Sequence, residues 1–393
     1  MQKEHIRLGI FGFGCVGQGL YQVLQQTRGI RADIARICIK NPDKPRPLPA
    51  ELFTTDRQAI LNDPDIDVVV ELIDDAEAAF EIVSTALSRG KAVVSANKKM
   101  IATHLQELLE LQAKHQVPLL YEGACCASIP IIRNLEEYYD NDLLTSVEGI
   151  FNGSTNYILT KVFDEGLAFD EALAEAQAKG FAETDPTLDI EGWDPKYKLV
   201  IILLHAFGLV VNPEDVFHFG IHRLNDHDIR FARQRGLRIK LLASCRREED
   251  RIVAYVLPKL VNHQNHLADV NHEYNGVVLE SAFSESQLIV GKGAGDRPTG
   301  SAVLSDISAL TYKYKYEYKK RAQANGSALV QAGEAVRLYV RFDDPNQVNW
   351  DDFIEIEERF ESRDSRYVIG SLGLDTLANA EWLRQDTVNI LGI

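Results

Sequence analysis

Apolar runs and stretches of helical spacing alternate along the first 130 residues. Short apolar runs that read as buried strands occupy Arg7–Phe11, Ala35–Ile39, Asp67–Leu72, Ala92–Ser95 and Val117–Tyr121. Helical spacing occurs between them, over Cys15–Gln26, Glu77–Ser88 and Leu105–His115. Strands that alternate with helices predict parallel βαβ units, so we expect residues 1–130 to form an α/β domain around a doubly wound parallel sheet.

The pattern changes after residue 130. Strands are predicted over Leu143–Phe151, Leu237–Cys245, Ile252–Val256, Gly276–Glu280 and Gln287–Val290, and helices over Tyr157–Asp164, Asp170–Lys179, Pro195–Phe207 and Thr299–Tyr312. Strand-rich sequence with segregated helices predicts an α+β domain over residues 131–298; the family resemblance described below implies that it is the substrate-binding and dimerisation domain. We expect the helix within residues 299–320 to pack back on the first domain.

The tail, residues 330–393, predicts a small accessory βα unit. Gln323–Gly333 has the composition of a linker. Val336–Phe342 and Tyr367–Gly373 alternate like strands, whereas Asn349–Phe360 is predicted to be a helix. Two strand patterns are too few for a complete small sheet.

Composition excludes several classes of protein. The 393 residues carry 42 Lys and Arg against 58 Asp and Glu, a net charge of −16, which argues against nucleic-acid binding. The longest apolar stretch, from Leu199 to Val211, is broken by polar residues and is too short to span a bilayer. The N-terminus lacks an apolar signal region. The five cysteines match neither a disulfide framework nor a zinc site, so we expect reduced thiols in the cytoplasm.

A glycine-rich turn follows the first predicted strand. Gly12-Phe13-Gly14-Cys15-Val16-Gly17 has GxGxxG spacing and opens the first helix. In this strand–turn–helix context the glycines allow a pyrophosphate to approach the backbone, and the helix N-terminus offers N–H groups to it. The alternative is a plain glycine-rich turn. We expect a Rossmann-type domain that binds a dinucleotide.

The residues after the second strand bear on which dinucleotide is bound. NAD-selective sites usually place Asp or Glu there, to bind the ribose 2′-hydroxyl. This chain has Lys40, with Lys44 and Arg46 nearby. A cation favours the 2′-phosphate of NADP, although NAD remains possible and these charges could simply be solvated.

A dense acidic stretch precedes the apolar helix. Residues 180–198 contain Glu183, Asp185, Asp189, Glu191 and Asp194, and end with Lys198. In the simplest interpretation Asp194 and Pro195 are the N-cap and first residue of the helix. Alternatively Lys198, one turn after Asp194, donates a proton to the oxygen of a carbonyl group whose carbon receives hydride.

At this stretch the sequence resembles homoserine dehydrogenase. The residues that match the family signature in order and spacing are Gly180, Glu183, Asp185-Pro186, Asp189, Asp194 and Lys198. The resemblance covers about residues 6–312 and includes Val69–Leu72, Ser95–Lys99, Asn152–Tyr157 and Gly293–Gly295. It implies the reversible NAD(P)H-dependent reduction of L-aspartate 4-semialdehyde to L-homoserine, in threonine, methionine and isoleucine biosynthesis, by a homodimer.

The resemblance also implies residue roles. Lys198 and Asp194 are the catalytic residues, with Lys198 as proton donor, and Asp194, Glu183, Asp189 and Lys98 bind the substrate. Besides the glycine turn and Lys40, the cofactor contacts Ser95, Lys98, Gly180, Glu183 and Gly295. A monovalent cation, sodium, is held mostly by backbone oxygens at Glu122, Cys125, Ala127 and Ile129.

Three features depart from the family. Cys125 and Cys126 replace the usual Val and small residue, and Asp74-Asp75 replace glycines near the expected pyrophosphate. The tail resembles the regulatory ACT domain only faintly, so we expect weak or absent inhibition by threonine. Two alternatives follow: a related NADP-dependent oxidoreductase of another small carbonyl compound, or an inactive NADP-binding sensor.

Overall fold

The computed structural model describes residues 5–249, 251–324, 328–329, 334–363 and 365–393. The chain divides into two compact units: unit 1 comprises residues 1–140 and 291–319, and unit 2 comprises residues 141–290 and 320–393. Most of the predicted linker, Gln323–Gly333, lies outside the described residues. In the described part of the chain, every helix is too short or too polar to cross a membrane.

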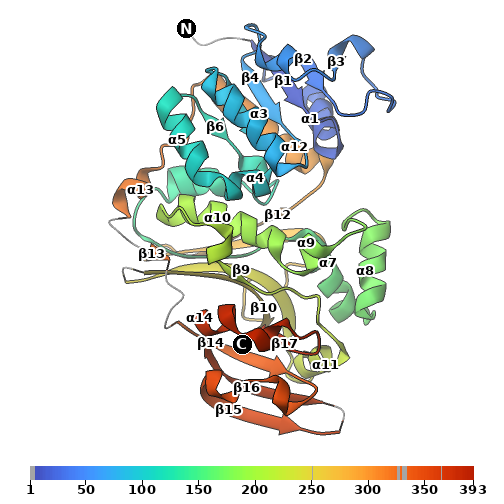
Figure 1. Ribbon diagram of the computed structural model, residues 1–393, viewed down its shortest axis with the longest axis vertical. Helices are drawn as coiled ribbons and strands as arrows, with labels where there is room; N and C mark the ends of the chain where they lie inside the picture. The colour runs from blue at the N-terminus through green and yellow to red at the C-terminus, as the bar shows by residue number, and fades with distance from the viewer. Residues whose placement is uncertain (1–4, 250, 325–327, 330–333, 364) are drawn as a thin grey trace. The chain divides into compact units, whose positions relative to one another are not determined.

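Unit 1 is built around a six-stranded sheet with the order β3-β2-β1-β4-β5-β6, and every strand pair in it is parallel (Figure 1). This is the strand order of a dinucleotide-binding doubly wound fold, which confirms the predicted fold class. Its elements are β1 Ile6–Phe11, α1 Cys15–Gln26, β2 Ala32–Cys38, η1 Ala50–Leu52, β3 Phe53–Thr54, α2 Gln58–Leu61, β4 Val68–Glu71, α3 Ala76–Ser88, β5 Ala92–Ser95, α4 Lys98–Thr103, α5 Leu105–His115, β6 Leu119–Leu120, η2 Glu122–Ala124, α6 Ile131–Arg133, the π-helical turn η3 Asn134–Tyr138 and α12 Asp296–Thr311.

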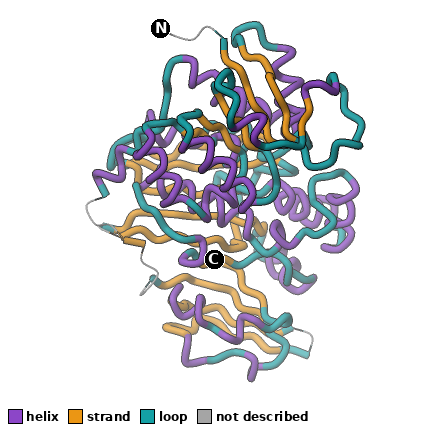
Figure 2. Tube along the Cα trace, turned by 45° about the horizontal axis from the view of Figure 1, so that its top comes forward, coloured by secondary structure: helices purple, strands orange, loops and turns teal. Residues whose placement is uncertain are grey.

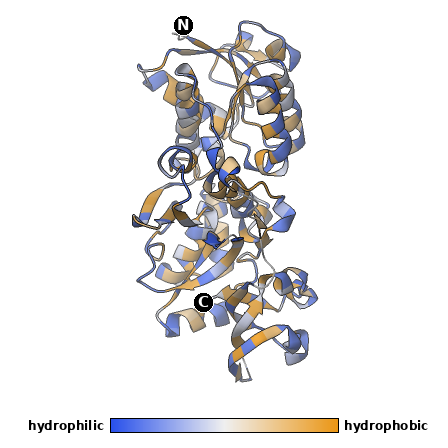
Figure 3. Ribbon diagram, turned by 90° about the vertical axis from the view of Figure 1, so that its left-hand side faces the viewer, coloured by the Kyte–Doolittle hydropathy of each residue, from blue (hydrophilic) through white to orange (hydrophobic). Residues whose placement is uncertain are grey.

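The helices of unit 1 pack on the sheet and on one another. Strand β4 is buried along its whole length, as expected for a central strand covered on both faces. Helix α3 contacts β4, β5 and α5, whereas α1 packs on α12. Figure 3 shows hydrophobic and hydrophilic residues alternating along the helices, as in amphipathic helices that cover a core.

Helix α12 returns to unit 1 from far along the chain and packs closely on α1. A Cβ added at Gly19 of α1 would overlap the carbonyl oxygen of Asp296, and one at Gly300 of α12 would lie 2.5 Å from the backbone nitrogen of Leu20. Glycine at both positions therefore lets the two helix backbones touch. Helix α12 lies within the compact unit 1 and contacts α1 there.

Unit 2 contains an eleven-stranded mixed sheet, with the path β12-β11-β7-β9-β10-β17-β14-β16-β15 and with β8 and β13 pairing on β10. Its elements are β7 Leu144–Ile150, α7 Gly153–Thr160, the π-helical turn η4 Lys161–Glu165, α8 Phe169–Ala178, α9 Thr187–Ile190, α10 Trp193–Phe207, η5 Pro213–Asp215, β8 Phe217–His218, α11 Asp226–Gln234, β9 Arg238–Glu248, β10 Arg251–Val261, β11 Tyr274–Ser281, β12 Glu285–Lys292, α13 Lys319–Gln323, β13 Ala328–Leu329, β14 Ala335–Arg341, η6 Pro345–Gln347, η7 Trp350–Asp352, β15 Phe353–Glu361, β16 Arg366–Gly373, α14 Leu374–Asn379, η8 Glu381–Arg384 and β17 Asn389–Gly392. Helix α10 contacts β7, β9 and β10 and is buried from Asp194 onward.

The tail is more complete than the sequence predicts. Its strands β14, β15, β16 and β17 form an antiparallel sheet with the order β17-β14-β16-β15 (Figure 2). Together with α14, and with short 3-10 turns where a first helix would lie, this is the βαββαβ arrangement of ferredoxin-like folds. The expectation of an incomplete small sheet is wrong.

The helix predicted over Asn349–Phe360 is also wrong, since most of this segment is strand β15. The register of β15 against β16 shifts between Phe353 and Glu355 and again between Ile356 and Glu358. Each shift interrupts the two-residue alternation that identifies a strand. The apolar residues Phe353, Ile356 and Phe360 therefore follow one another at helical spacing.

The tail shares a hydrophobic core with the rest of unit 2. Leu338, Val368 and Ile390 of the tail pack in one cluster with Val253 and Leu257 of β10. Residues 320–393 thus belong to the same compact unit as residues 141–290. The three-part division of the chain into domains stays a prediction.

Candidate active site

The glycine turn of unit 1 has the geometry of a phosphate-binding loop. Gly12 has φ +92°, and a Cβ there would lie 2.5 Å from the Leu72 carbonyl oxygen. A Cβ at Gly17 would lie 2.7 Å from the Gly12 carbonyl oxygen, so this glycine allows α1 to start close to the turn. Gly14 is the N-cap of α1, makes no side-chain cap, and has open space where a Cβ would point. The turn and the helix N-terminus thus fit a dinucleotide pyrophosphate.

The other residues of the turn have different surroundings. Phe13 is buried, with its ring 5.6 Å edge-on from that of Phe53, whereas Cys15 is exposed and Val16 half-buried. Burial and the charge of Asp296 raise the pKa of the Cys15 thiol, so it remains protonated at neutral pH.

Lys40 and Arg46 lie in the loop after β2. Lys40 is exposed. The Arg46 guanidinium donates to the carbonyl oxygens of Lys44 and Asn41, each at 2.7 Å, and lies 5.3 Å from the centre of the Phe53 ring. The loop therefore holds the Arg46 cation in place, while Lys40 extends into solvent.

The next strand ends carry Ser95, Lys98 and the two aspartates that depart from the family pattern. Ser95 is the buried last residue of β5, and Lys98 is the half-buried first residue of α4. Asp75 is the N-cap of α3 and accepts a hydrogen bond from the backbone N–H of Ala78 at 2.9 Å. This cap gives Asp75 a structural role that the sequence interpretation lacked.

The residues expected around a cation lie between β6 and α6, on η2 and the loop after it. The carboxylate of Glu122 is buried and accepts the N–H groups of Ile132 and Arg133, each at 2.9 Å, so it caps α6. Burial and the nearby Asp306 raise the pKa of Glu122 to about 8. Cys126 and Ala127 have φ of 45° and 40° and turn the backbone sharply between Cys125 and Ile129. Among the described residues no cluster of three or more His, Cys, Asp or Glu side chains could hold a metal.

In unit 2, Lys198 and Asp194 form a buried ion pair on α10. The Nζ of Lys198 lies 2.7 Å from Oδ2 of Asp194 and 2.6 Å from the carbonyl oxygen of Phe151, to which it also donates. The two residues are 6% and 4% exposed. Helix α10 begins after Gly192, whose φ is +91°, so Asp194 is its second residue and not its N-cap. The capping role predicted for Asp194 is wrong, and its carboxylate faces the lysine instead.

Asn152 connects this ion pair to a second carboxylate, a role that sequence reasoning missed. Its Nδ2 donates to Oδ1 of Asp189 at 2.6 Å and to Oδ2 of Asp194 at 2.9 Å. Its Oδ1 accepts from the Thr155 N–H at 2.8 Å and caps α7. An Asn at the end of a strand, before Gly and two hydroxyl residues, is a cap signal that could have singled it out. We call Asn152, Asp189, Asp194 and Lys198 the lysine–carboxylate network.

Gly180 and Glu183 lie beyond the end of α8. Gly180 has φ +74° and follows the C-cap Lys179, and the N–H of Phe181 donates to the Ala176 carbonyl oxygen, which is a Schellman ending. This confirms the predicted role of Gly180 at the helix end. Glu183 is exposed, and its carbonyl oxygen accepts from Gln177 Nε2 at 3.0 Å. The loop presents the Glu183 side chain to solvent, outside the lysine–carboxylate network.

Gly295 has φ +119° and precedes α12, in unit 1.

The predicted site residues fall into two groups, one in each unit. Unit 1 holds Gly12, Phe13, Gly14, Cys15, Val16, Gly17, Lys40, Ser95, Lys98, Glu122, Cys125, Ala127, Ile129 and Gly295; unit 2 holds Gly180, Glu183, Asp189, Asp194 and Lys198.

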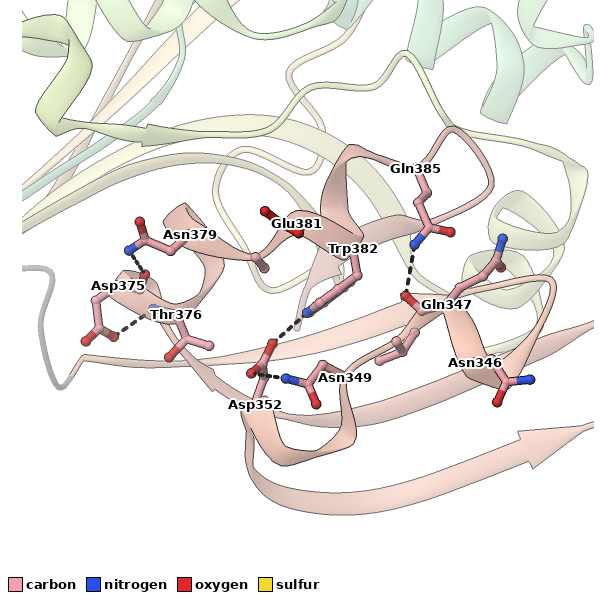
Figure 4. Close-up of a pocket in the computed structure, with 12 residues that line it drawn as sticks. Asn346, Gln347, Asn349, Asp352, Asp375, Thr376, Asn379, Glu381, Trp382 and Gln385 are labelled. Atoms are coloured by element: carbon pink, nitrogen blue, oxygen red, sulfur yellow. Dashed lines mark hydrogen bonds between the residues drawn. The ribbon is translucent and has the colours of Figure 1, made fainter.

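A separate polar pocket lies in the tail (Figure 4). Two of its side chains are held by hydrogen bonds within the tail: Trp382 Nε1 donates to Asp352 Oδ2 at 2.7 Å, and Gln385 Nε2 donates to the main-chain carbonyl oxygen of Gln347 at 3.2 Å.

Comparisons with known proteins agree with this geometry. A family model described as homoserine dehydrogenase matches residues 130–308, and one described as homoserine dehydrogenase, NAD binding domain, matches residues 12–122. The homoserine dehydrogenase of Bacillus subtilis (strain 168) is 36% identical over 314 residues, 78% of this chain and 72% of that protein. That of Synechocystis is 38% identical over 313 residues, 77% of this chain and 72% of that protein.

Solved structures give the same result. The crystal structure of a homoserine dehydrogenase from Thiobacillus denitrificans superposes with a TM-score of 0.85 at 31% identity, covering 98% of this chain and 97% of that one. A hyperthermophilic archaeal homoserine dehydrogenase mutant in complex with NADPH gives 0.66 at 25% identity, covering 80% of this chain and 99% of that one. Because of this identity over most of both chains, and because the model of the family's NAD binding domain matches residues 12–122, the chain belongs to the homoserine dehydrogenase family of NAD(P)-dependent oxidoreductases.

Proposed function

We propose that this chain reduces L-aspartate 4-semialdehyde to L-homoserine with NADPH, and that the lysine–carboxylate network of unit 2 is its catalytic centre. The observation that carries the proposal is the buried Lys198–Asp194 pair, held by Asn152. A lysine kept among carboxylates at the start of a buried helix is a suitable proton donor to an oxygen.

In this proposal Lys198 protonates the aldehyde oxygen as the carbonyl is reduced. The bound cofactor supplies the hydride, which adds to the aldehyde carbon and leaves oxidised NADP. One N–H bond of the Lys198 ammonium breaks and the O–H bond of homoserine forms. Asp194 holds the ammonium in position before the transfer, and solvent returns the proton to the lysine. In the oxidation of homoserine Lys198 accepts the proton.

In this proposal carboxylate side chains recognise the α-ammonium group of the substrate. Asp194, Asp189 and Glu183 bind the α-ammonium group, since a carboxylate–ammonium contact is a charge-assisted hydrogen bond. Lys98, at the start of α4, contacts the substrate from the cofactor side. Gly180 and Gly295 border the nicotinamide.

For the cofactor, the glycine turn from Gly12 to Gly17 holds the pyrophosphate and Ser95 and Lys98 line the site. Lys40, with Arg46 beside it, binds the 2′-phosphate, which makes NADP the preferred cofactor. The NADPH bound by the archaeal relative supports this preference.

A sodium ion bound through main-chain oxygens of Glu122, Cys125, Ala127 and Ile129 is part of the same proposal. The consecutive left-handed residues Cys126 and Ala127 support it, because they re-aim the carbonyl groups of this loop. Carbonyl oxygen is a ligand that hard cations accept. The Glu122 carboxylate already caps α6, so only its main-chain oxygen serves.

We also infer a homodimer that works in the cytoplasm. The five cysteines are free thiols, as a reducing compartment requires. Size-exclusion chromatography with light scattering tests the dimer.

The reaction is tested with purified protein by homoserine-dependent reduction of NADP and of NAD. We expect turnover with both and a lower KM for NADP. Cofactor binding without turnover of homoserine or aspartate semialdehyde would contradict the proposal and favour a cofactor-binding sensor.

A further inference from the structure

A buried carboxyl group that the proposed chemistry does not use lies at the cofactor edge of unit 1. Glu71 is the last residue of β4 and is fully buried. In the sheet it pairs with Phe11, the last residue of β1, on one side and with Ser95 on the other. The strands β1 and β4 are where the strand order of this sheet reverses, and dinucleotides bind in the crevice at that point.

Four hydrogen bonds close a ring through Glu71. Its Oε1 accepts the N–H of Ile73 at 2.7 Å, and the Ile73 carbonyl oxygen accepts from Asn97 Nδ2 at 3.0 Å. The Asn97 N–H donates to Ser95 Oγ at 3.1 Å, and the Ser95 hydroxyl donates to Glu71 Oε2 at 2.6 Å. The ring joins the loop after β4 to the loop after β5.

This ring supports two parts of the cofactor site. The space beside Gly12 is filled by the loop after β4, since an added Cβ would lie 2.5 Å from the Leu72 carbonyl oxygen and 3.2 Å from Ile73 Cγ2. On the other side, Asn97 is the N-cap of α4, at whose first position Lys98 stands.

We propose that Glu71 is a positioning residue for cofactor binding: as a carboxylate it holds the loops after β4 and β5 in the arrangement that supports the glycine turn, and its protonation releases them. The inference rests on the cofactor site assigned above.

The direction of the bonds requires the ionised form. Both oxygens of Glu71 act as acceptors, and the Ser95 hydroxyl already accepts from Asn97 while it donates to Glu71. A proton on Oε2 would meet the Ser95 proton, so one of the two donors would lose its acceptor.

The environment brings this protonation near neutral pH. Burial and the charge of Asp74 raise the pKa of Glu71 to about 7, against the opposing effect of the Ser95 and Ile73 hydrogen bonds. The charged and titratable groups on the elements that adjoin Glu71 include Asp74 and Asp75 after β4, Glu77 near the start of α3, Lys98 and Lys99 at the start of α4, Cys15 at the start of α1 and Arg7 on β1. Asp74 is exposed, so a substitution can remove its charge without disturbing the packing of the core.

The test is the dissociation constant of NADPH and of NADH between pH 5.5 and 8.5, measured by fluorescence on the full chain. For the wild type we expect affinity for both cofactors to fall about tenfold below pH 7, the effect of losing one charge-assisted hydrogen bond. Glu71→Gln, which keeps the side-chain shape but cannot ionise, should lose this step. Titration of the NADPH 2′-phosphate is common to both proteins and cancels in the comparison.

Asp74→Asn is the second variant and leaves the ring intact. It should shift the step to lower pH, because the charge that raises the pKa of Glu71 is gone. The proposal would be overturned if the fall in cofactor affinity at low pH were the same in Glu71→Gln or Asp74→Asn as in the wild type. It would also be overturned if the cofactor bound more tightly at low pH, because the charge of Glu71 would then repel it. A flat wild-type profile with normal affinity overturns this inference alone, whereas failure to bind either cofactor at any pH overturns the proposed function as well.

Discussion

Lys198 Nζ lies 2.7 Å from Asp194 Oδ2, one turn apart on α10, and both side chains are buried. Another lysine on the same helix gives a matched comparison. Lys196 is 2% exposed and lies 3.4 Å from His218 Nδ1, and burial lowers its pKa to about 8. Two buried lysines two residues apart thus have different partners, and only one of them faces the carboxylates.

The first prediction concerns the proton donor. Lys198→Ala should lower kcat about 10²- to 10⁴-fold, the usual value of general acid catalysis, while NADPH still binds. Steady-state kinetics and cofactor fluorescence check this. Lys196→Ala is the control and should keep kcat within a few-fold. Near wild-type turnover in Lys198→Ala would rule out its role.

The second prediction separates the two functions of Asn152. Asn152→Ser keeps an oxygen that can cap α7 but loses the amide donor to Asp189 and Asp194. We expect thermal stability near that of the wild type and a raised KM for homoserine, because the carboxylates lose their common donor. Asn152→Ala should have the same kinetic defect and also lose about 0.5–2 kcal/mol of stability with the cap. Equal KM values for wild type and Asn152→Ser would show that the amide does not organise the site.

The third prediction concerns cofactor choice. Lys40→Ala should raise the KM for NADP about ten- to a hundredfold, since a charge-assisted contact contributes about 1.5–3 kcal/mol. The KM for NAD serves as the internal control and should change little. Equal changes for both cofactors would mean that Lys40 does not contact the 2′-phosphate.

The fourth prediction compares two arginines on β14. Arg341 is buried and donates to Asp228 Oδ1 at 3.0 Å, whereas Arg337 pairs with Glu357 in solvent. Burial raises the pKa of Asp228 despite its partner. Arg341→Ala leaves this carboxyl without its guanidinium and should cost about 3–5 kcal/mol of unfolding free energy in urea. Arg337→Ala should cost at most about 1 kcal/mol. Similar losses of unfolding free energy in the two variants would contradict the distinction between the buried and the exposed ion pair.

The fifth prediction concerns the tail. The glycine turn and Lys198, the proposed proton donor, lie outside the tail, so from the sequence alone a chain ending near residue 326 should keep homoserine oxidation if it folds. The structure adds that this truncation uncovers Val253 and Leu257 of β10, which pack against the tail. We therefore expect a lower melting temperature or aggregation, with activity in whatever fraction folds. A folded truncated protein that bound NADPH normally yet lost all activity would place the tail in the active site.

The complete tail sheet also removes the reason for expecting little response to threonine. That expectation rested on an incomplete sheet, and the four strands in ferredoxin-like order contradict its premise. Titration of the purified enzyme with threonine decides whether the tail senses it.

Unit 1 could be predicted because its signals are local. Five of its six strands overlap apolar runs of the sequence, whereas the two-residue strand β3 was not predicted. The GxGxxG spacing marks the glycine turn, and the structure shows the steric reason for glycine at Gly12. The doubly wound parallel sheet followed from the alternation of strands and helices, whereas the order of its strands comes from the structure. The cap at Asp75 was not predicted because the spacing indicated a helix from Glu77, one residue after the true start of α3 at Ala76.

The site in unit 2 could be predicted only in part. Lys198 and Asp194 are one helical turn apart, so their pairing is readable from spacing. Asn152 and Asp189 reach the same place from other elements, and no spacing along the chain joins them. The register shifts of β15 interrupt the alternation of apolar and polar residues in this strand, so the spacing of its apolar residues wrongly predicted a helix.

The close contact of α1 with α12 has a consequence for how the chain is made. Residues 1–140 leave the ribosome first, but α12 is translated only after the strands of unit 2 up to β12. Until then the face of α1 around Gly19 stays uncovered, so unit 1 cannot complete its packing before α12 has been made. The order of synthesis therefore makes completion of unit 1 depend on prior translation of most of unit 2.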